Sequence, residues 1–361
     1  MGAGRGRTQG GEPPMTLVVA ILGLIFLVII HELGHMLTAK ALGVRVPEFG
    51  IGFGPPIFKR KIGKTVYSFR IFLLGGFAKM AGMNDGAQGP DTFPAKAAWR
   101  RALIIFAGPL ANILAAVAIL AVVLMSTGVV TGVKPEVRQI EPNSMAERVG
   151  IQPGDRFVAV DGARIKGWDE FQREVRERDP GEEISVTVER GGEEKTFTGK
   201  LGADPNNPDA ALVGVRPEVE TTTYGPVEAV SMAVGQVVKV TGLLGAFVGD
   251  LVTGDEKFYD NVTGPVGIAS VGSTSVQQGF FPQLLALISL NLALFNLLPL
   301  LPLDGGHLFF IAAEKVLGRP VSQETMGRIA AFGIALVLML FLFATYADLS
   351  KIFTGQPFIP E

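Results

Sequence analysis

Residues 15–40 read MTLVVAILGLIFLVIIHELGHMLTAK, and this stretch decides the fold. Its first sixteen residues carry no charge, and a helix needs about 20 mostly apolar residues to cross the hydrocarbon core of a bilayer. The helix therefore continues into the HELGH motif and crosses with polar residues inside it. Arg5 and Arg7 precede the run, as in a signal peptide, but the apolar region of a signal peptide does not normally run into such a motif.

The HELGH motif has the residue types of a hydrolytic metal site. On a helix, His31 and His35 project from one face about one turn apart, so two imidazole nitrogens can reach one zinc ion. Glu32 lies beside them and is placed to take a proton from a water molecule that attacks a carbonyl carbon. The cluster could instead cap a short helix, but ionisable residues inside a membrane segment are costly and usually functional.

The composition agrees with a membrane protein and limits the metal ligands. Hydrophobic residues make up 48% of the 361 residues and charged residues only 18%, which is unusual for a soluble protein. The net charge of -2 gives no basic surplus, so we expect no nucleic-acid partner. The chain has no cysteine and three histidines, so imidazole and carboxylate groups must hold any metal.

Four apolar runs predict a polytopic α-helical membrane protein with transmembrane helices at residues 15–40, 102–128, 280–303 and 329–347. Residues 229–252 are also apolar, although polar residues interrupt them. A fifth crossing there would reverse the third helix relative to the first and would separate the polar ends of the two helices. We therefore expect an amphipathic extracytoplasmic linker over residues 216–279, a disordered tail over residues 1–14, and a C-terminal tail over residues 348–361.

The distribution of charge predicts which side of the membrane each loop faces. Residues 40–101 contain eleven Lys and Arg residues against three acidic residues, and positively charged loops stay in the cytoplasm. The loop 41–101 and the connection 304–328 are therefore expected in the cytoplasm. Both termini and the long segment between the second and third helices are expected outside.

A catalytic zinc ion usually has three protein ligands and one open position, so a third ligand is needed. Asp304 is the best candidate, because it follows the apolar run in a segment where Pro299 and Pro302 break the helix. Broken helices at membrane depth occur only where they line an enclosed or watered cavity. His307 is the rival ligand, but it follows two flexible glycines, and a polar residue near the cytoplasmic surface is the simpler interpretation.

Together with Gly108-Pro109-Leu110-Ala111-Asn112 and residues 296–306, the motif resembles the site-2 protease family, with the order of elements of its bacterial regulator-of-sigma-E branch. The resemblance implies an intramembrane endopeptidase of the bacterial plasma (inner) membrane, with one zinc ion per chain and Asp304 as the third ligand. It places the zinc site towards the cytoplasmic half. The implied substrates are single-pass membrane proteins, such as anti-sigma factors, that have already received a first extracytoplasmic cut.

The resemblance also implies residues that bind substrate. Asn112 and Asn296 would lie near the substrate or the transition state, although a buried amide can equally form a hydrogen bond between helices. The strand-like run 65–73, followed by Gly75 and Gly76, predicts a β-hairpin in the cytoplasmic loop. By the resemblance, this hairpin is membrane-associated and re-entrant, and it offers a strand edge to an unwound substrate.

Short strands and turns predict a separate α+β domain over residues 134–215, between the second and third helices. The run GIQPGDR at residues 150–156, followed by a β-run and Asp161-Gly162, resembles a PDZ domain. PDZ domains capture chain ends or strands by edge addition. Here the domain would bind peptide or substrate and would act as a gate that admits substrates only after their first cut.

Two other classes of function fit part of the pattern. A zinc or proton transporter would use the same intramembrane His and Asp residues. An inactive membrane scaffold would use only the PDZ-like domain. A transporter has no need of Glu32 beside the metal, and a scaffold predicts a broken motif, whereas all four residues of the chemistry are present. The sequence therefore favours a zinc protease.

Overall fold

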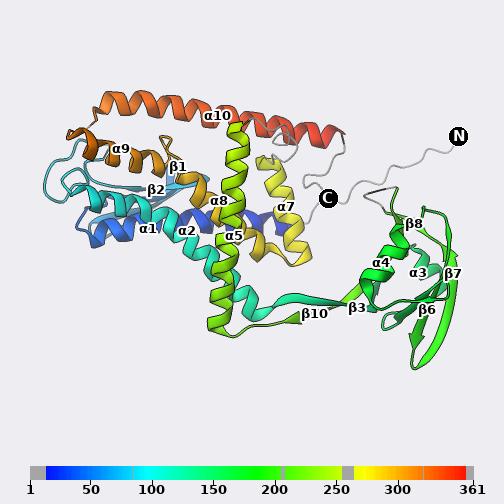
Figure 1. Ribbon diagram of the computed structural model, residues 1–361. Coiled ribbons are helices and arrows are strands. Elements are labelled where there is room, and N and C mark those ends of the chain that lie inside the picture. Colours follow the sequence, from blue (N-terminus) through cyan, green and yellow to red (C-terminus); the bar gives the residue numbers. More distant parts are fainter. Residues whose placement is uncertain are drawn as a thin grey trace. The chain divides into compact units, whose positions relative to one another are not determined.

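The computed structural model describes residues 14–83, 85–204, 207, 209–253, 264–319 and 321–354. The chain forms two compact units, one made of Met1–Val123 with Pro226–Glu361 and the other of Leu124–Gly225 (Figure 1). Of the predicted tails, residues 1–13 and 355–361 lie outside the described residues.

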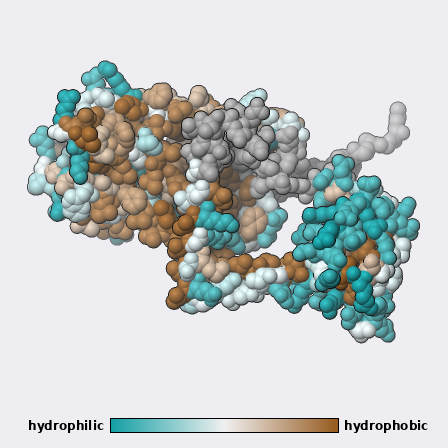
Figure 2. All heavy atoms as spheres, in the orientation of Figure 1, coloured by the Kyte–Doolittle hydropathy of each residue, from teal (hydrophilic) through white to brown (hydrophobic). Residues whose placement is uncertain are grey.

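Three described helices of the first unit are long and apolar enough to cross a membrane, namely α1 (Pro14–Ala41), α2 (Ala98–Ser126) and α10 (Gln323–Thr354). Figure 2 shows apolar residues gathered over this unit. α10 is longer than the predicted span 329–347, because the helix continues into the expected tail. The predicted third span is represented by α8 (Phe281–Asn296), which has only sixteen residues. It ends early because Pro299 and Pro302 cannot continue a helix.

The predicted linker 216–279 contains two helices, α5 (Pro226–Thr253) and α7 (Pro265–Gln278). α5 packs against α8 in a buried cluster that includes Val237 and Leu290, and it is not one of the three long apolar helices found in the described chain. Figure 1 shows α5 running across the direction of α1, α2 and α10. Its expected place at the membrane surface stays a prediction.

Strands β1 (Glu48–Ile62) and β2 (Thr65–Lys79) lie where the sequence predicts a hairpin. Near the turn, residues 56–62 of β1 are aligned antiparallel with residues 65–70 of β2. Beyond this region the register shifts repeatedly, and the positive φ angle of Gly52 (87°) allows β1 to bend there. The result is a curled sheet instead of a flat ribbon.

The curl gives this sheet two different outer edges. Residues 48–51 of β1 are aligned both with residues 66–69 and with residues 76–79 of β2, so they lie between two segments of the same strand. One outer edge is therefore residues 76–79, and the other is residues 56–62. The distinction matters because only one of these edges lies beside the polar motif of α1.

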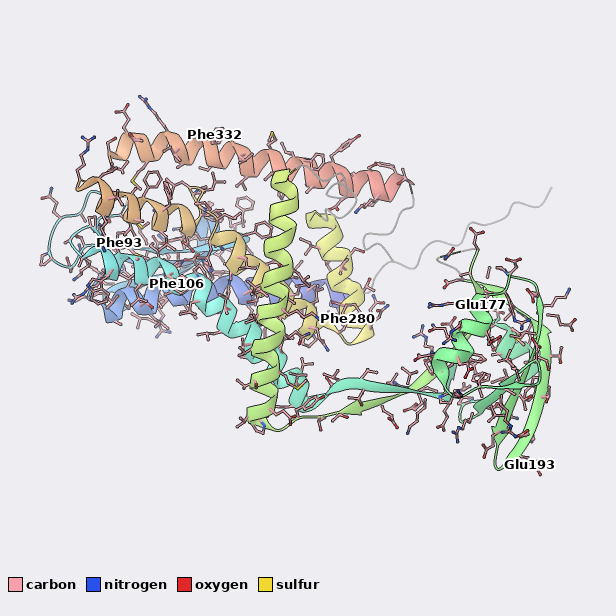
Figure 3. The ribbon with its side chains drawn as sticks, in the orientation of Figure 1. Phe93, Phe106, Glu177, Glu193, Phe280 and Phe332 are labelled. Carbon is pink, nitrogen blue, oxygen red and sulfur yellow. The ribbon has the colours of Figure 1, made fainter. Side chains whose placement is uncertain are left out.

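A buried core holds this sheet, α1, α2 and α9 (Asp304–Leu317) together. Met36 of α1, Ile104 of α2 and Ile311 of α9 belong to one cluster of buried apolar side chains, and Phe93, labelled in Figure 3, joins it from the loop before α2. Burying an apolar side chain of this size stabilises the fold by about 1.5–3 kcal/mol. This packing fixes the position of α9 relative to the HELGH motif.

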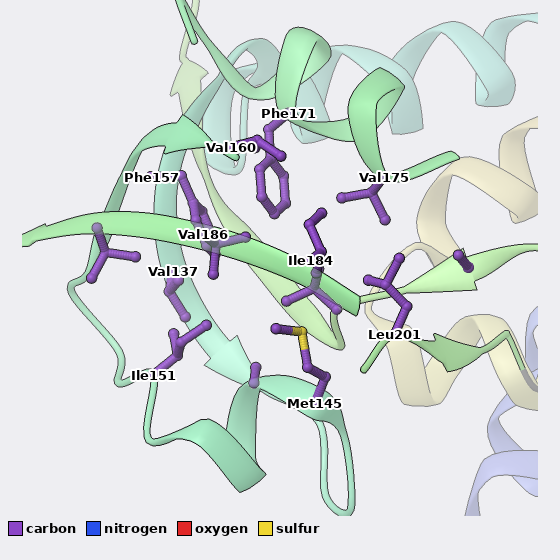
Figure 4. Close-up of a cluster of buried hydrophobic side chains, with 14 residues drawn as sticks. Val137, Met145, Ile151, Phe157, Val160, Phe171, Val175, Ile184, Val186 and Leu201 are labelled. Atoms are coloured by element: carbon purple, nitrogen blue, oxygen red, sulfur yellow. The ribbon is translucent and has the colours of Figure 1, made fainter. Parts of the chain in front are cut away.

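The second unit is a twisted sheet with two short helices. The elements that form it are β3 (Val129–Ile140), α3 (Met145–Val149), β4 (Arg156–Val160), β5 (Ala163–Arg164), α4 (Trp168–Arg176), β6 (Glu183–Arg190), β7 (Glu193–Lys200), β8 (Gly202–Ala203), β9 (Ala211–Leu212) and β10 (Val215–Thr222). The main sheet has the order β10-β3-β4-β6-β7, with β5 paired to β4. Phe157, Phe171 and Val186 lie in its core (Figure 4).

This unit is larger than the predicted domain 134–215. β3 begins at Val129 and pairs with β10 as far as Thr222, so the two strands extend the unit at both ends. The sequence could not show this extension, because the pairing joins residues that are far apart in the chain.

A buried ion pair stabilises the turn that leads into β4. The Asp155 carboxylate is 1% exposed, and it accepts hydrogen bonds from Arg190 Nε (2.6 Å) and from the backbone N–H of Gln152 (2.8 Å). Burial by itself would raise the pKa of Asp155, but the hydrogen bonds from Arg190 and Gln152 outweigh burial and hold the pKa below its ordinary value. The charged form of Asp155 is therefore the one that stabilises this unit.

Replacing Asp155 by Asn should destabilise the second unit by on the order of 2 kcal/mol, because Arg190 loses a charged partner. A carboxylate with a lowered pKa contributes stability above the ordinary Asp pKa of about 4 and loses it as the pH falls further. The wild type should therefore lose this stability in acid, and the Asp155→Asn variant should not. Hydrogen exchange of amides in β4 and β6 measures both effects, with the exposed Asp209→Asn as control. Equal exchange in the two variants would contradict the assignment.

Candidate metal centre

The two histidines of the HELGH motif meet Asp304 at one point. His31 and His35 lie one turn apart on α1, with 7% and 5% of their surface exposed, and Asp304 is the first residue of α9. Asp304 Oδ2 lies 3.1 Å from His31 Nε2 and 3.2 Å from His35 Nε2, and the two Nε2 atoms are 3.3 Å apart. Residues as far as 273 positions apart in the chain therefore form one compact cluster.

The three donor atoms fit one zinc ion. A tetrahedral zinc ion with bonds of about 2.0 Å keeps its ligand atoms about 3.3 Å apart. The observed separations of 3.1, 3.2 and 3.3 Å agree with this geometry. Two imidazoles and one carboxylate are also a ligand set found in catalytic zinc sites, where the fourth position is kept for water or substrate.

A hydrogen bond at Nδ1, the nitrogen of His35 that faces away from Asp304, determines which ring nitrogen carries the proton. His35 Nδ1 lies 2.9 Å from the backbone carbonyl oxygen of Ile104, on α2. Because a carbonyl oxygen only accepts, Nδ1 carries the proton and donates it. Nε2 of the neutral ring then has its lone pair directed at the cluster, as a metal ligand requires.

Asn112 of α2 can do the same for His31. Its side chain is fully buried, and its amide nitrogen is placed 3.3 Å from His31 Nδ1, while its Oδ1 has no hydrogen-bond partner in the described part of the chain. The two ends of an amide are chosen from the hydrogen-bond network. When Nε2 binds a metal, Nδ1 carries a proton and needs an acceptor. Turning the amide over gives Nδ1–H that acceptor and gives Oδ1 a partner.

Two glycines let α2 approach α1 closely enough for these contacts. A Cβ atom on Gly34 would lie 2.3 Å from the backbone oxygen of Ala107, which is far inside contact distance. A Cβ atom on Gly108 would lie 2.3 Å from His35 Nε2 and 2.9 Å from His31 Nε2. The space occupied by the metal-facing atoms therefore exists only because residue 108 has no side chain.

Two further glycines set the position of Asp304. A Cβ atom on Gly305 would lie 2.1 Å from the backbone oxygen of Leu297, and one on Gly306 would lie 2.5 Å from the backbone nitrogen of Leu301. The chain between α8 and α9 can therefore fold back against the start of α9. At the other end of α9, Glu314 accepts a 2.7 Å hydrogen bond from Arg101 of α2. Both ends of the helix are thus held.

Glu32 lies beside the edge of the curled sheet formed by residues 76–79. A Cβ atom on Gly76 would be 3.0 Å from Glu32 Cγ, and α1 and β2 pack against each other. Gly75 adopts a positive φ angle of 109° next to the ring of Phe53. The edge formed by residues 76–79 therefore borders the polar motif.

The other predicted site residues lie elsewhere. His307 is half-buried on the first turn of α9, and it does not belong to the three-residue cluster found among the described residues. Asn296 ends α8, and its Nδ2 donates to the backbone oxygen of Leu292 (2.9 Å). Ser289, which the sequence did not single out, donates to the backbone oxygen of Asn112 (2.8 Å) and ties α8 to α2. A lone serine in an apolar run gave no signal of this role.

The sequence also matches known proteins. The family model of Peptidase family M50 matches residues 19–340. A protein of Agrobacterium fabrum named "Putative zinc metalloprotease" is 35% identical over 93% of this chain and 96% of its own length. The protein of Geobacillus kaustophilus named "Zinc metalloprotease RasP" is 29% identical over 95% of this chain and 99% of its own length.

Among solved structures, the chain is similar to the PDZ domain of the SdrC-like protein of Listeria monocytogenes, with a TM-score of 0.21 and 22% identity. The similarity covers 24% of this chain and 86% of that one. A solution structure from Geobacillus thermodenitrificans, with a TM-score of 0.21 and 28% identity, covers 23% of this chain and 94% of that one.

Replacing Gly108 by Ala should lower zinc occupancy, because the new methyl group would fill space next to both Nε2 atoms. Zinc content of the purified protein and its titration with a competing chelator measure the effect, and circular dichroism checks the helices. The matched control is Gly242→Ala in α5, where a Cβ atom meets nothing within 4 Å. Equal zinc retention by both variants would show that residue 108 does not border the metal position.

Proposed function

Because this chain belongs to peptidase family M50, the zinc-dependent site-2 proteases, we propose that it hydrolyses peptide bonds inside transmembrane segments at the cluster of His31, His35 and Asp304. The observation that carries the proposal is the convergence of these three donor atoms beside Glu32, in a unit built from long apolar helices. Burying ionisable groups in such a place costs free energy, so the groups found there usually serve a function.

A bound zinc ion supplies Lewis acidity, which activates water and polarises a carbonyl group. The chain's own residues then do the rest. Glu32 accepts a proton from water as the oxygen bonds to the carbonyl carbon, and later gives the proton to the nitrogen as the carbon–nitrogen bond breaks. Ile104 and Asn112 hold the rings of His35 and His31, so that both Nε2 atoms keep their direction.

The substrate would bind along the sheet edge at residues 76–79. A peptide bond in a helix is shielded by its neighbours, so the segment must be extended before it can react. The N–H and C=O groups of an edge strand can hold such an extended chain, and Gly75 and Gly76 present backbone without a side chain. This edge borders Glu32 in the described residues, which would place the extended segment beside the general base. Asn296 is a further candidate for contact with substrate.

The second unit is proposed to be PDZ-like and to select substrates. A cavity of about 660 Å³ lies between the first half of β3 and the start of α4, and it is lined by Val130, Gly132, Trp168 and Arg173 among others. On the side of β3 opposite β10, β3 pairs with β4 at Glu136 alone among the described residues. The edge of β3 along the cavity can therefore accept an added peptide strand.

We further propose the arrangement in the cell. The protein would lie in the bacterial plasma (inner) membrane, with the loop 41–101 in the cytoplasm and the second unit outside, because the basic residues are concentrated in that loop. The site would open towards the cytoplasmic half. Substrates would be single-pass membrane proteins, such as anti-sigma factors, whose outer domain a first protease has already removed.

Two substitutions should separate metal binding from proton transfer. Asp304→Ala should lose zinc and activity together, because only two ligands remain. Glu32→Gln should keep zinc and lose cleavage by about a hundredfold to ten-thousandfold, which is the usual cost of removing a general base. Metal analysis and cleavage of a single-span substrate measure both. His307→Ala is the control and should keep zinc. Zinc loss in the His307 variant, with zinc retained in the Asp304 variant, would exchange the two roles.

Removing the second unit should relax selection but leave the chemistry. Val129 and Thr222 are paired neighbours, so a short glycine linker can replace residues 129–222. The shortened enzyme should cut a trimmed substrate as before and should begin to cut full-length substrates. The same deletion combined with Glu32→Gln is the control and should cut neither. If the deletion abolished cleavage of the trimmed substrate while zinc and helices were kept, the unit would belong to the substrate-binding machinery instead of a gate.

A further inference from the structure

The edge of the curled sheet formed by residues 56–62 carries an exposed cationic and apolar segment. Residues 57–64 read IFKRKIGK, and we call them the cationic edge segment. Every one of these residues is exposed, including Ile57 (65%), Phe58 (59%) and Ile62 (58%). An unpaired strand edge with large exposed apolar side chains is a liability unless something covers it.

No ion pair joins the cations of this segment to an acidic residue in the part of the chain that the structure describes. Its four cations, Lys59, Arg60, Lys61 and Lys64, lie in a stretch with no acidic residue between Glu48 and Asp85. Glu48 is already paired with Arg70 at 2.7 Å. The Asp85 carboxylate accepts hydrogen bonds from two backbone N–H groups of its own turn. The segment therefore presents a strong positive field to whatever lies beside it.

The apolar residues are interleaved with these cations along one strand. Phe58 is aligned with Phe69, which is also exposed, and Ile71 and Phe72 continue the exposed apolar surface along β2. Clusters of Lys and Arg next to exposed aromatic and aliphatic side chains suit a membrane interface, where cations meet headgroups and apolar side chains reach the acyl boundary. The deep hydrocarbon core would not suit the four charges.

The place of the sheet in the chain brings it to such an interface. β1 begins at Glu48, seven residues after α1 ends at Ala41, and β2 is followed by the membrane-length helix α2. We propose that the cationic edge segment binds the headgroups of anionic phospholipids, with Ile57, Phe58 and Ile62 inserted at the acyl boundary. This contact would fix the height in the bilayer of the opposite edge, residues 76–79, beside Glu32. The lipid contact itself does not depend on the proposed protease mechanism.

The absence of cysteine allows a direct test in the full chain. Phe58→Cys, labelled with a polarity-sensitive fluorophore, is placed in nanodiscs of phosphatidylcholine alone or mixed with phosphatidylglycerol. The emission should shift to the blue only with phosphatidylglycerol, and the shift should weaken as salt is added. Lys59→Gln, Arg60→Gln and Lys61→Gln together should remove it. The matched control, Arg138→Gln, Arg156→Gln and Arg176→Gln in the second unit, should keep it. A label at Glu193→Cys should not respond to the lipid.

Several outcomes would overturn the proposal, and circular dichroism shows that each variant is folded. An equal blue shift in phosphatidylcholine alone would mean that apolar insertion does not depend on headgroup charge. The same shift on adding soluble glycerophosphoglycerol to phosphatidylcholine discs would point to a free phosphate ligand. A shift that requires a substrate peptide instead of the anionic lipid would assign the segment to a protein partner. Because the readout is not cleavage, a failure of the proposed function would leave this result unaffected.

Discussion

Three polar atoms must meet within about 3.3 Å of one another inside a unit built from apolar helices, and most of its local structure follows from this requirement. The atoms come from α1 and α9, and His31 and Asp304 are 273 residues apart in the chain. Neither helix can hold the other by itself. α2 contacts both helices. Its Ile104 and Asn112 form hydrogen bonds with the histidine rings of α1, and its Arg101 binds the far end of α9. The second helix is thus as much a part of the centre as the helices that carry the three donor atoms.

Glycine is the residue that makes this assembly possible. In a helix interior, Gly costs about 1 kcal/mol relative to Ala, so its use at Gly34 and Gly108 needs a compensating gain. The gain is steric, since a methyl group at either position would collide with backbone or with the metal-facing nitrogens. Gly305 and Gly306 serve the same purpose where the broken chain returns to α9. Close approach of backbones, more than any added contact, brings the donor atoms into range.

The sequence could predict those features that depend on local spacing. The four-residue separation of His31 and His35 places them on one face of any helix. Pro299 and Pro302 predict the break in the chain after α8. Asp304 followed from the need for a third ligand. Features that depend on remote pairing could not be predicted. The extension of the second unit to Thr222, the sixteen-residue length of α8, and the second alignment of residues 48–51 arise only when distant segments meet. The nearness of Gly108 to both rings is of the same kind.

The curled sheet connects these observations, because its two edges have opposite chemistry. The edge at residues 76–79 contains Gly76 and Ala78 and has no charge until Lys79, so its backbone can approach Glu32 closely. The edge at residues 56–62 has three consecutive cations between large apolar side chains. In a flat two-stranded hairpin the two edges would belong to directly adjacent strands. The curl inserts residues 48–51 between two segments of β2, which moves the charged edge away from the cluster of His31, His35 and Asp304. A sheet of so few residues can therefore border a centre that needs uncluttered backbone on one side while it carries a concentrated positive charge on the other.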